Sequence, residues 1–247
     1  MDRGLYVAMS GAGELMRAQA VHANNLANVN TVGFRADLAQ SRAMPVFADA
    51  LPSRAYAMTE RPAVNQDTGV LVETGRPLDV AVAGDGWIAV LARDGSEAYT
   101  RAGDLQIDAF GMLTTATGQP VLGNAGPIAV PPSERIEMGA DGTISVVPLG
   151  QPASGIAEID RIKLVNPPAT SLQKGVDGLL RLAGGAPSEA DAQVQLRSGF
   201  LEGSNVNAVN AMTEVISLAR QFEMQVKLMK TFEDNAAQAA RILQLRG

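Results

Sequence analysis

The chain has 247 residues, 46% of them hydrophobic and 19% charged, a composition typical of a folded protein with one large or two smaller domains. Its net charge is −6 and it shows no cluster of Lys and Arg, so a nucleic-acid partner is not expected, because phosphate binding needs concentrated positive charge. The absence of cysteine excludes disulfides and thiolate metal sites.

Residues 1–34 are predicted to form an N-terminal helix with one apolar side. Apolar residues recur mostly at steps of three and four, the spacing of a helical stripe. They are Leu5, Met9, Ala12, Met16, Ala20, Ala23 and Leu26 or Ala27. Gly11 and Gly13 lie within this stretch, and each weakens a helix by roughly 1 kcal/mol relative to Ala. The helix is therefore expected to need a partner along its apolar side.

The start of the chain also bears on targeting. Only five consecutive apolar residues precede Ser10, whereas a cleaved signal peptide needs roughly 7–15. No stretch approaches the ~18 apolar residues of a membrane span. We therefore expect neither a cleaved signal peptide nor membrane insertion, which leaves export by another route open.

An asparagine cluster follows in the phrase HANNLANVNTVGFR, residues 22–35. Its members are Asn24, Asn25, Asn28 and Asn30. Asn side chains compete with the helix backbone for hydrogen bonds, so the first helix is expected to end within the cluster. Gly33 would then turn the chain toward the domain that follows.

The middle of the chain changes period. Residues 35–69 show scattered Pro and no sustained pattern, and we interpret them as an extended linker. Residues 70–200 contain short alternating or β-branched segments such as WIAVLA and GTISVV, which indicate strands. Asp-Gly pairs at intervals supply the residues that tight hairpin turns prefer. This part is predicted to be an all-β domain of many short strands.

Residues 201–247 carry the strongest helical signal. Apolar residues alternate steps of four and three, a heptad pattern that only Gln225 interrupts. The series is Ala211, Val215, Leu218, Phe222, Gln225, Met229, Phe232, Ala236, Ala239 and Leu243. Ser204 and Asn205 are the predicted capping residues, and a helix from about 207 to 245 would be on the order of 58 Å long.

The predicted fold class is α+β. The N- and C-terminal helices would form a coiled-coil-like α domain, and the central all-β domain would lie between them in the sequence. Pairing the two ends of the chain has a high loop-closure cost. The helices are therefore expected to be loosely ordered in an isolated monomer and to order when neighbouring chains cover them.

The sequence offers little chemistry. The sole histidine, His22, has no carboxylate at ligand spacing, and no Ser–His–Asp set can be built around it. Acidic pairs such as Asp104 with Asp108 lie beside turns or on alternating strands, where Asp usually serves a turn or a solvated face. We predict no catalytic residue, no metal ligand, no cofactor and no small-molecule substrate.

Three blocks of sequence resemble one family. The phrases MDRGLYVAMSGA and ANNLANVNTVGFR are similar to the amino-terminal signature of flagellar basal-body rod and hook proteins, most closely to proximal-rod members. LDVAVAGDGWIAV with YTRAGDLQIDAFGMLTTATGQPVLG, and then GFLEGSNVNAVNAMTEVISLARQFEMQVKLMKTFED, follow in the family's order. Arg35 stands where the family often has Lys, which keeps the charge.

The resemblance implies a structural subunit of the rod, the hollow drive shaft that transmits torque from motor to hook across the periplasm. Its partners would be other copies, neighbouring rod proteins and, in transit, the flagellar type III export apparatus, without a cleaved signal. The terminal helices would build the interface between subunits. The residues expected there are Leu5, Met9, Met16, Asn24, Asn25, Leu26, Asn28, Asn30, Gly33, Phe34, Asn205, Val215, Leu218, Phe222, Met229, Phe232 and Leu243.

Three alternatives stay open at this point. The asparagines could bind groups on adjacent subunits, or they could simply form a polar cap at the end of the helix. The chain could belong to the distal rod or the base of the hook instead of the proximal rod. In a different class, it could be a secreted enzyme or carbohydrate-binding module on a β scaffold, with the helices as flanks.

Overall fold

The computed structural model describes residues 3–39, 41–48, 51–59, 63–150 and 155–244. The chain divides into two compact units. The helical unit contains residues 1–28, 37–65 and 206–247, and the β unit contains residues 29–36 and 66–205. The chain therefore passes between the units four times, near residues 28, 36, 65 and 205.

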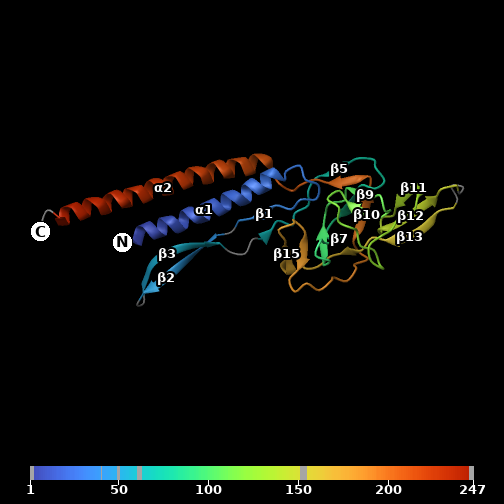
Figure 1. Ribbon diagram of the computed structural model, residues 1–247, viewed down its shortest axis with the longest axis horizontal. Helices are drawn as coiled ribbons and strands as arrows, with labels where there is room; N and C mark the ends of the chain where they lie inside the picture. The colour runs from blue at the N-terminus through green and yellow to red at the C-terminus, as the bar shows by residue number, and fades with distance from the viewer. Residues whose placement is uncertain (1–2, 40, 49–50, 60–62, 151–154, 245–247) are drawn as a thin grey trace. The chain divides into compact units, whose positions relative to one another are not determined.

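The helical unit is built on α1 (Arg3–Ala27) and α2 (Ala208–Gln244), which run antiparallel side by side (Figure 1). Two glycines of α1 lie on the contact. A Cβ atom on Gly4 would come 2.9 Å from the ring of Phe232, and one on Gly11 would lie 3.7 Å from the side chain of Gln225. Glycine at these positions therefore lets the two helices approach closely.

The helix ends partly follow the prediction. Ending at Ala27, α1 stops within the asparagine cluster, as expected. Helix α2 begins at Ala208, and the Oδ1 atom of Asn207 accepts a hydrogen bond from the Asn210 N–H at 3.1 Å. Asn207 is thus the N-cap residue. The prediction of Ser204 and Asn205 as caps was wrong, because they precede the first turn by too many residues.

The helical unit also contains strands. β1 (Asp37–Leu38) pairs antiparallel with β4 (Ala63–Val64), and β2 (Ser41–Ala48) pairs antiparallel with β3 (Leu51–Thr59). The sequence predicted only an extended linker over 35–69. Pro45 and Pro52 explain the difference, because Pro inside an apolar run argues against a strand except at edges and bulges.

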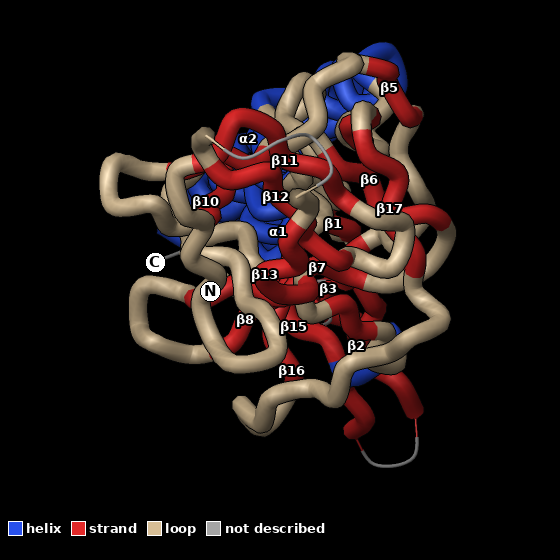
Figure 2. Tube along the Cα trace, turned by 90° about the vertical axis from the view of Figure 1, so that its right-hand side faces the viewer, coloured by secondary structure: helices blue, strands red, loops and turns tan. Residues whose placement is uncertain are grey.

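The β unit consists of short strands joined by loops (Figure 2). The strands are β5 (Leu71–Glu73), β6 (Val80–Ala83), β7 (Trp87–Leu91), β8 (Glu97–Thr100), β9 (Leu105–Ile107), β10 (Leu113–Thr115), β11 (Ser133–Met138), β12 (Thr143–Pro148), β13 (Ala157–Arg161), β14 (Leu164–Val165), β15 (Leu172–Lys174), β16 (Leu180–Leu182), β17 (Gln195–Ser198) and β18 (Phe200–Glu202). A single 3₁₀ turn, η1 (Ala169–Ser171), precedes β15.

These strands form small antiparallel sheets. The largest has the order β14-β7-β8-β16-β15, and a second has the order β11-β12-β13. β17 pairs with β6 and β18 with β5, so the last strands of the unit lie beside its first ones. Fully buried side chains such as Val80, Ile88 and Leu105 fill the core between the sheets. The α+β fold class is confirmed.

The predicted Asp-Gly turns are present. Gly95 and Gly142 adopt φ values of +80° and +88°, in the left-handed region that disfavours any residue with a Cβ atom. Among the described residues, no helix combines the length and the apolar character needed to cross a bilayer.

Candidate assembly interface

One side of α2 faces α1. Ala211 on this side is 6% exposed, and the next six members of the predicted heptad series are half-buried. These are Val215, Leu218, Phe222, Gln225, Met229 and Phe232. Ala236 and Ala239 continue the series but are exposed, because Gly4 near the start of α1 already lies level with Phe232. The side chain of Leu243 lies outside the described residues.

A groove lies at the end of the α1–α2 contact where α1 begins. The groove has a volume of about 640 Å³ and opens on the helical unit. Its lining residues are Leu5, Tyr6, Val226, Met229, Lys230, Phe232, Glu233 and Ala236. Apart from Lys230 and Glu233 the lining is apolar, so the groove extends the apolar contact beyond the start of α1.

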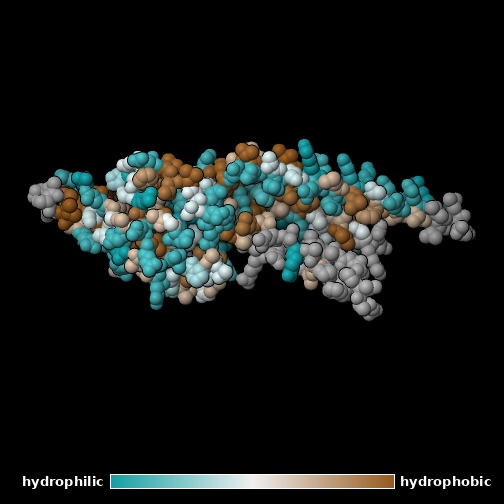
Figure 3. Space-filling view, turned by 180° about the vertical axis from the view of Figure 1, so that it is seen from behind, coloured by the Kyte–Doolittle hydropathy of each residue, from teal (hydrophilic) through white to brown (hydrophobic). Residues whose placement is uncertain are grey.

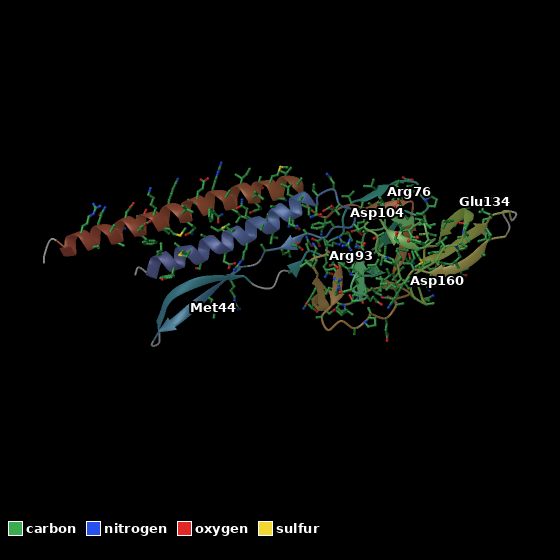
Figure 4. All side chains as sticks on the ribbon, in the orientation of Figure 1. Met44, Arg76, Arg93, Asp104, Glu134 and Asp160 are labelled. Carbon is green, nitrogen blue, oxygen red and sulfur yellow. The ribbon has the colours of Figure 1, made fainter. Side chains whose placement is uncertain are left out.

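The predicted stripe of α1 spans two faces of the helix. Within the stripe, Ala12 is buried and Leu5 and Leu26 are half-buried, while the buried Ala8 lies outside the predicted series. Met9 and Met16, in contrast, are 53% and 58% exposed. Methionine sulfur atoms project from both helices in Figure 4. At 100° per residue, Met9 and Met16 lie about 160° and 140° around the helix from Gly11, which contacts α2, whereas Ala12 lies about 100° from it, so only one edge of the stripe reaches the α1–α2 contact.

Two of the four asparagine side chains, those of Asn25 and Asn28, have hydrogen-bond partners within the chain. Asn25 is 5% exposed, and its amide donates to the Asp37 carbonyl at 2.8 Å and accepts from the Asp37 N–H at 2.9 Å. The Asn28 amide donates to the Asn24 carbonyl at 3.0 Å, so Asn28 caps the last turn of α1. Asn24 and Asn30 are exposed.

A buried ion cluster lies at the start and end of the β unit. The Glu202 carboxylate forms an ion pair with Arg35 Nη2 at 2.8 Å and accepts a hydrogen bond from Arg101 Nη1 at 2.9 Å, and all three side chains are at most 3% exposed. Both guanidinium groups lie over the Trp87 ring, at 5.5 Å and 5.2 Å from its centre. Burial lowers the pKa of Arg35, and the Glu202 carboxylate opposes that shift.

Glu202 also holds the backbone of two other segments. Its Oε1 atom accepts from the Gly69 N–H at 2.8 Å, and its carbonyl accepts from the Gly33 N–H at 2.7 Å. Gly33 has φ +66°, and a Cβ atom there would lie 2.2 Å from the Arg101 backbone. Only glycine fits at this turn.

Asn205 completes the connection. Its Oδ1 atom accepts from the Ala36 N–H at 2.8 Å, and its amide donates to the Asp67 carbonyl at 2.9 Å. Its own N–H donates to the Phe34 carbonyl at 3.3 Å, and the Lys174 ammonium lies 4.0 Å from the centre of the Phe34 ring. Asn205 thus joins its own segment to residues 34–36 and to Asp67 inside the β unit. All three segments continue into the helical unit.

Of the residues expected at the interface, the structure brings Val215, Leu218, Phe222, Met229 and Phe232 to the side of α2 that faces α1. It places Gly33, Phe34 and Asn205 in the β unit, around Glu202. The ion cluster itself was missed. A signal was present, because Arg35 and Glu202 are lone charges in the phrases NTVGFR and GFLEG.

The described residues show little that suggests reaction chemistry. No three His, Cys, Asp or Glu side chains among them lie close enough together to hold a metal ion. A cavity of about 330 Å³ in the β unit is lined by Trp87, Arg101, Asp85 and neighbouring residues. Arg101 there is already paired with Glu202.

The exposed apolar residues of the two helices are characteristic of a chain that assembles with other chains. Three family models agree with this class. They are described as Flagella basal body rod protein, matching residues 5–35, Flagellar hook protein FlgE/F/G D1 domain, matching 81–146, and Flagellar basal body rod FlgEFG protein C-terminal, matching 197–242.

Full-length relatives carry the same description. The flagellar basal-body rod protein FlgF of Escherichia coli (strain K12) is 46% identical, over 99% of this chain and 100% of the relative. FlgF of Salmonella typhimurium (strain LT2) is 43% identical over the same shares. FlgG of Bacillus subtilis (strain 168) is 32% identical over 95% of this chain and 96% of the relative. The chain therefore belongs to the flagellar basal-body rod protein family, and it is more similar to these FlgF relatives than to this FlgG.

Proposed function

We propose that the chain is a structural subunit of the proximal rod of the bacterial flagellum, and that it has no enzymatic activity. It polymerises through its terminal helices into the hollow drive shaft that carries torque from motor to hook. The observation that carries this proposal is the exposure of large apolar side chains on both helices, including Met9, Met16, Val209 and Ile216. A chain that worked alone would leave this area in contact with water.

The proposed assembly uses coiled-coil-like packing. Residues 1–34 and 201–247 form the rod core, residues 35–69 connect them to the central part, and residues 70–200 form the β domain outside the core. The heptad series of α2 supports this arrangement, because its half-buried members face α1 while Ala236 and Ala239 have no cover in one chain. Their cover comes from a neighbouring subunit.

The residues of the proposed interface fall into two groups. Leu5, Met9, Met16, Leu26, Val215, Leu218, Phe222, Met229, Phe232 and Leu243 supply apolar contact within and between chains. Asn24, Asn25, Asn28, Asn30, Gly33, Phe34 and Asn205 fix the course of the backbone where the helices end. The hydrogen bonds of Asn25 and Asn205 to other segments support this second role.

The partners of the subunit are other copies of itself and neighbouring rod proteins. It reaches the periplasm through the flagellar type III export apparatus without a cleaved signal peptide, and it binds no nucleic acid, cofactor or small-molecule substrate. The net charge of −6 and the absence of a cluster of Lys and Arg support the exclusion of nucleic acid. The subunit does not insert into the membrane.

Replacing Phe222 by Asp tests the proposal. A carboxylate at this half-buried position would have to be desolvated in the helix contact, so the variant should fail to restore swimming in cells that lack the natural chain. Its β unit should stay folded, as seen in the fluorescence of the sole tryptophan, Trp87.

Gln221→Asp is the matched control, because Gln221 is exposed and next to Phe222. This variant should swim normally. Normal swimming of the Phe222→Asp variant would contradict the proposed function. Electron microscopy of labelled basal bodies would separate the proximal rod from the distal rod, by the position of the label relative to the membrane ring.

A further inference from the structure

The β unit contains a buried positive charge that its own side chains balance only in part. The guanidinium groups of Arg35 and Arg101 share the single carboxylate of Glu202, and all three side chains are at most 3% exposed. Burial lowers the pKa of Arg35, Glu202 raises it, and the charge of Arg101 lowers it again. Asp67, the next acid near Arg35, is exposed to water, which screens its charge. The buried cluster therefore holds two cations and one anion.

Arg101 keeps hydrogen-bond donors without an acceptor, because a guanidinium has five N–H groups to satisfy. Its Nη1 atom donates to Glu202 at 2.9 Å and to the Val82 carbonyl at 3.4 Å. Its Nη2 atom donates to the Gly84 carbonyl at 2.7 Å. Among the described residues, the buried Nε atom finds no acceptor, and Nη2 keeps a second N–H group. Nε and Nη2 form one of the sides on which a guanidinium binds both oxygens of a carboxylate.

A cavity of about 330 Å³ lies beside Arg101 within the β unit. It is also lined by Trp87, by the amide side chains of Gln66 and Asn166, and by Asp85. Asp85 and Asn166 are exposed, so the cavity is open to solvent. Its volume lies within the range of pockets that hold small ligands. It is therefore large enough for an acidic side chain.

Neutral donors of the lining are also free to bind a ligand. In the part of the chain that the structure describes, the indole N–H of Trp87 and the side-chain amide of Asn166 make no hydrogen bond. The Gln66 amide reaches the Ala169 carbonyl only at 3.5 Å. Asp85 is the one acid among the lining residues, and its exposed charge would repel an anion. The other groups favour a ligand that accepts hydrogen bonds and carries a negative charge.

We propose that this cavity binds a carboxylate group, held by Arg101 and by the N–H groups of Trp87 and Asn166. An ionised carboxylate only accepts hydrogen bonds, so it matches a lining of donors. It also supplies the second anion that the buried cluster lacks, in surroundings where water weakens the attraction little. The inference goes beyond the proposed function, because the site lies within one chain and does not depend on assembly.

A neighbouring rod subunit is the expected source of the carboxylate. The β unit carries many hydrophilic residues on its surface, shown in teal in Figure 3, so its contacts with other chains are expected to use polar and charged groups. This choice of source rests on the proposed function. A small organic acid has the same chemistry and is the other source.

Titration of the purified full-length chain with acetate tests the site. Acetate should change the fluorescence of Trp87, the sole tryptophan, and should raise the melting temperature in a saturable way. Chloride at the same ionic strength should do neither, and nor should acetamide, which has a similar shape without the charge. A response that does not saturate, or that acetamide reproduces, would overturn the proposal.

Two variants of the lining sharpen this test. Asp85→Asn should tighten acetate binding several-fold, because it removes the repelling charge, and Asn166→Leu should weaken it several-fold. Glu134→Gln is the matched control, because Glu134, labelled in Figure 4, is exposed and lies outside the cavity. Equal acetate affinities of Asp85→Asn and Glu134→Gln would overturn the proposal. A lower melting temperature of Asp85→Asn before acetate is added would also overturn it, because Asp85 would then already balance the cluster.

Labelling of Asn166→Cys distinguishes the two sources, because the chain has no cysteine of its own. A maleimide should label this variant in the free protein but not in intact basal bodies, where an acidic side chain of a neighbour fills the cavity. The fully exposed Val176→Cys should be labelled in both states. Labelling of Asn166→Cys in both states would overturn the neighbouring subunit as the source and assign the carboxylate to a free acid. If the purified chain binds acetate but does not enter the basal body, the proposed function fails and the site stands.

Discussion

At the scale of single residues, Glu202 has the largest role in the β unit. It is 1% exposed and binds two buried guanidinium groups together with the N–H groups of Gly33 and Gly69. Charged groups are buried in proteins only where they are paired and hydrogen-bonded. The sequence marks such a residue as unusual, but it cannot name partners that lie more than a hundred positions away, because tertiary packing decides them.

Removing the Glu202 carboxylate from the ion cluster should lower the stability of the protein strongly. Glu202→Ala leaves Arg35 and Arg101 buried without their carboxylate, so the free energy of unfolding should fall by about 3–5 kcal/mol. Urea unfolding followed by Trp87 fluorescence measures this change. Glu137→Ala is the control: it breaks the exposed pair with Arg135 and should cost less than about 1 kcal/mol.

Asp104 and Asp177 predict opposite changes of stability with pH, because the pKa of Asp104 is raised and that of Asp177 is lowered. Burial raises the pKa of Asp104, and the nearby Asp79 raises it further; Figure 4 labels Asp104. The folded state then holds this proton more tightly than the unfolded state, so stability falls as pH rises from below 3.8 through the raised pKa. Asp104→Asn should therefore raise the melting temperature at pH 7 and change it little at pH 3.

Asp177 behaves in the opposite way. Its hydrogen bond from Arg181 lowers its pKa, so its stabilising contribution is present above 3.8 and is lost as pH falls through the lowered value. Asp177→Asn should lower the melting temperature at pH 7. Melting temperatures of Asp104→Asn and Asp177→Asn, measured at pH 3 and pH 7, check both predictions. Two variants that change the melting temperature in the same direction at pH 7 would contradict this account.

At the scale of elements, the periodicity of the sequence was sufficient to predict the two helices. The heptad series predicted the side of α2 that faces α1, and the asparagines predicted where α1 ends, because both signals are local. The strands β2 and β3 were not predicted, since each contains a Pro and neither alternates. The division of α1 into two faces was also missed, because a mixed three- and four-step pattern fits either face until the position of α2 is known.

Gly13 within α1 and Gly33 after its end differ in ways that mutation can detect. A Cβ atom on Gly13 would meet nothing within 4 Å, so Gly13→Ala should stabilise the helix by roughly 1 kcal/mol. Circular dichroism during urea unfolding measures this gain. Gly33→Ala should instead destabilise the chain, because its Cβ atom would collide with the Arg101 backbone. A gain from both substitutions would contradict the assigned conformations.

At the scale of the whole molecule, the two units differ in how much of their apolar surface is buried. The β unit contains an apolar core of fully buried side chains, whereas most side chains of α2 are exposed. Stability is therefore unevenly distributed, and the helical unit is expected to open more easily in a single chain. The order of elements and the α+β class could be predicted from the sequence, but the four crossings between units could not, because they depend on tertiary contacts between segments far apart in the chain.

Limited proteolysis of the dilute protein checks this difference. Cleavage should begin in α1 and α2, and a β-rich fragment close to residues 66–205 should persist. Mass spectrometry of the fragments identifies the cut sites. Helices that resist the protease longer than the β unit in the dilute protein would show that a single chain already covers their apolar faces.

The most direct test of assembly through the helices is a comparison of labelling before and after assembly. Single cysteines replacing Met16 and Ile216, and a control cysteine replacing the fully exposed Val176 of the β unit, would be treated with a maleimide reagent. All three should react in the free protein, and only the Val176→Cys variant should react in intact basal bodies. Equal labelling of Met16→Cys and Ile216→Cys in both states, with the chain present in the basal body, would contradict the account.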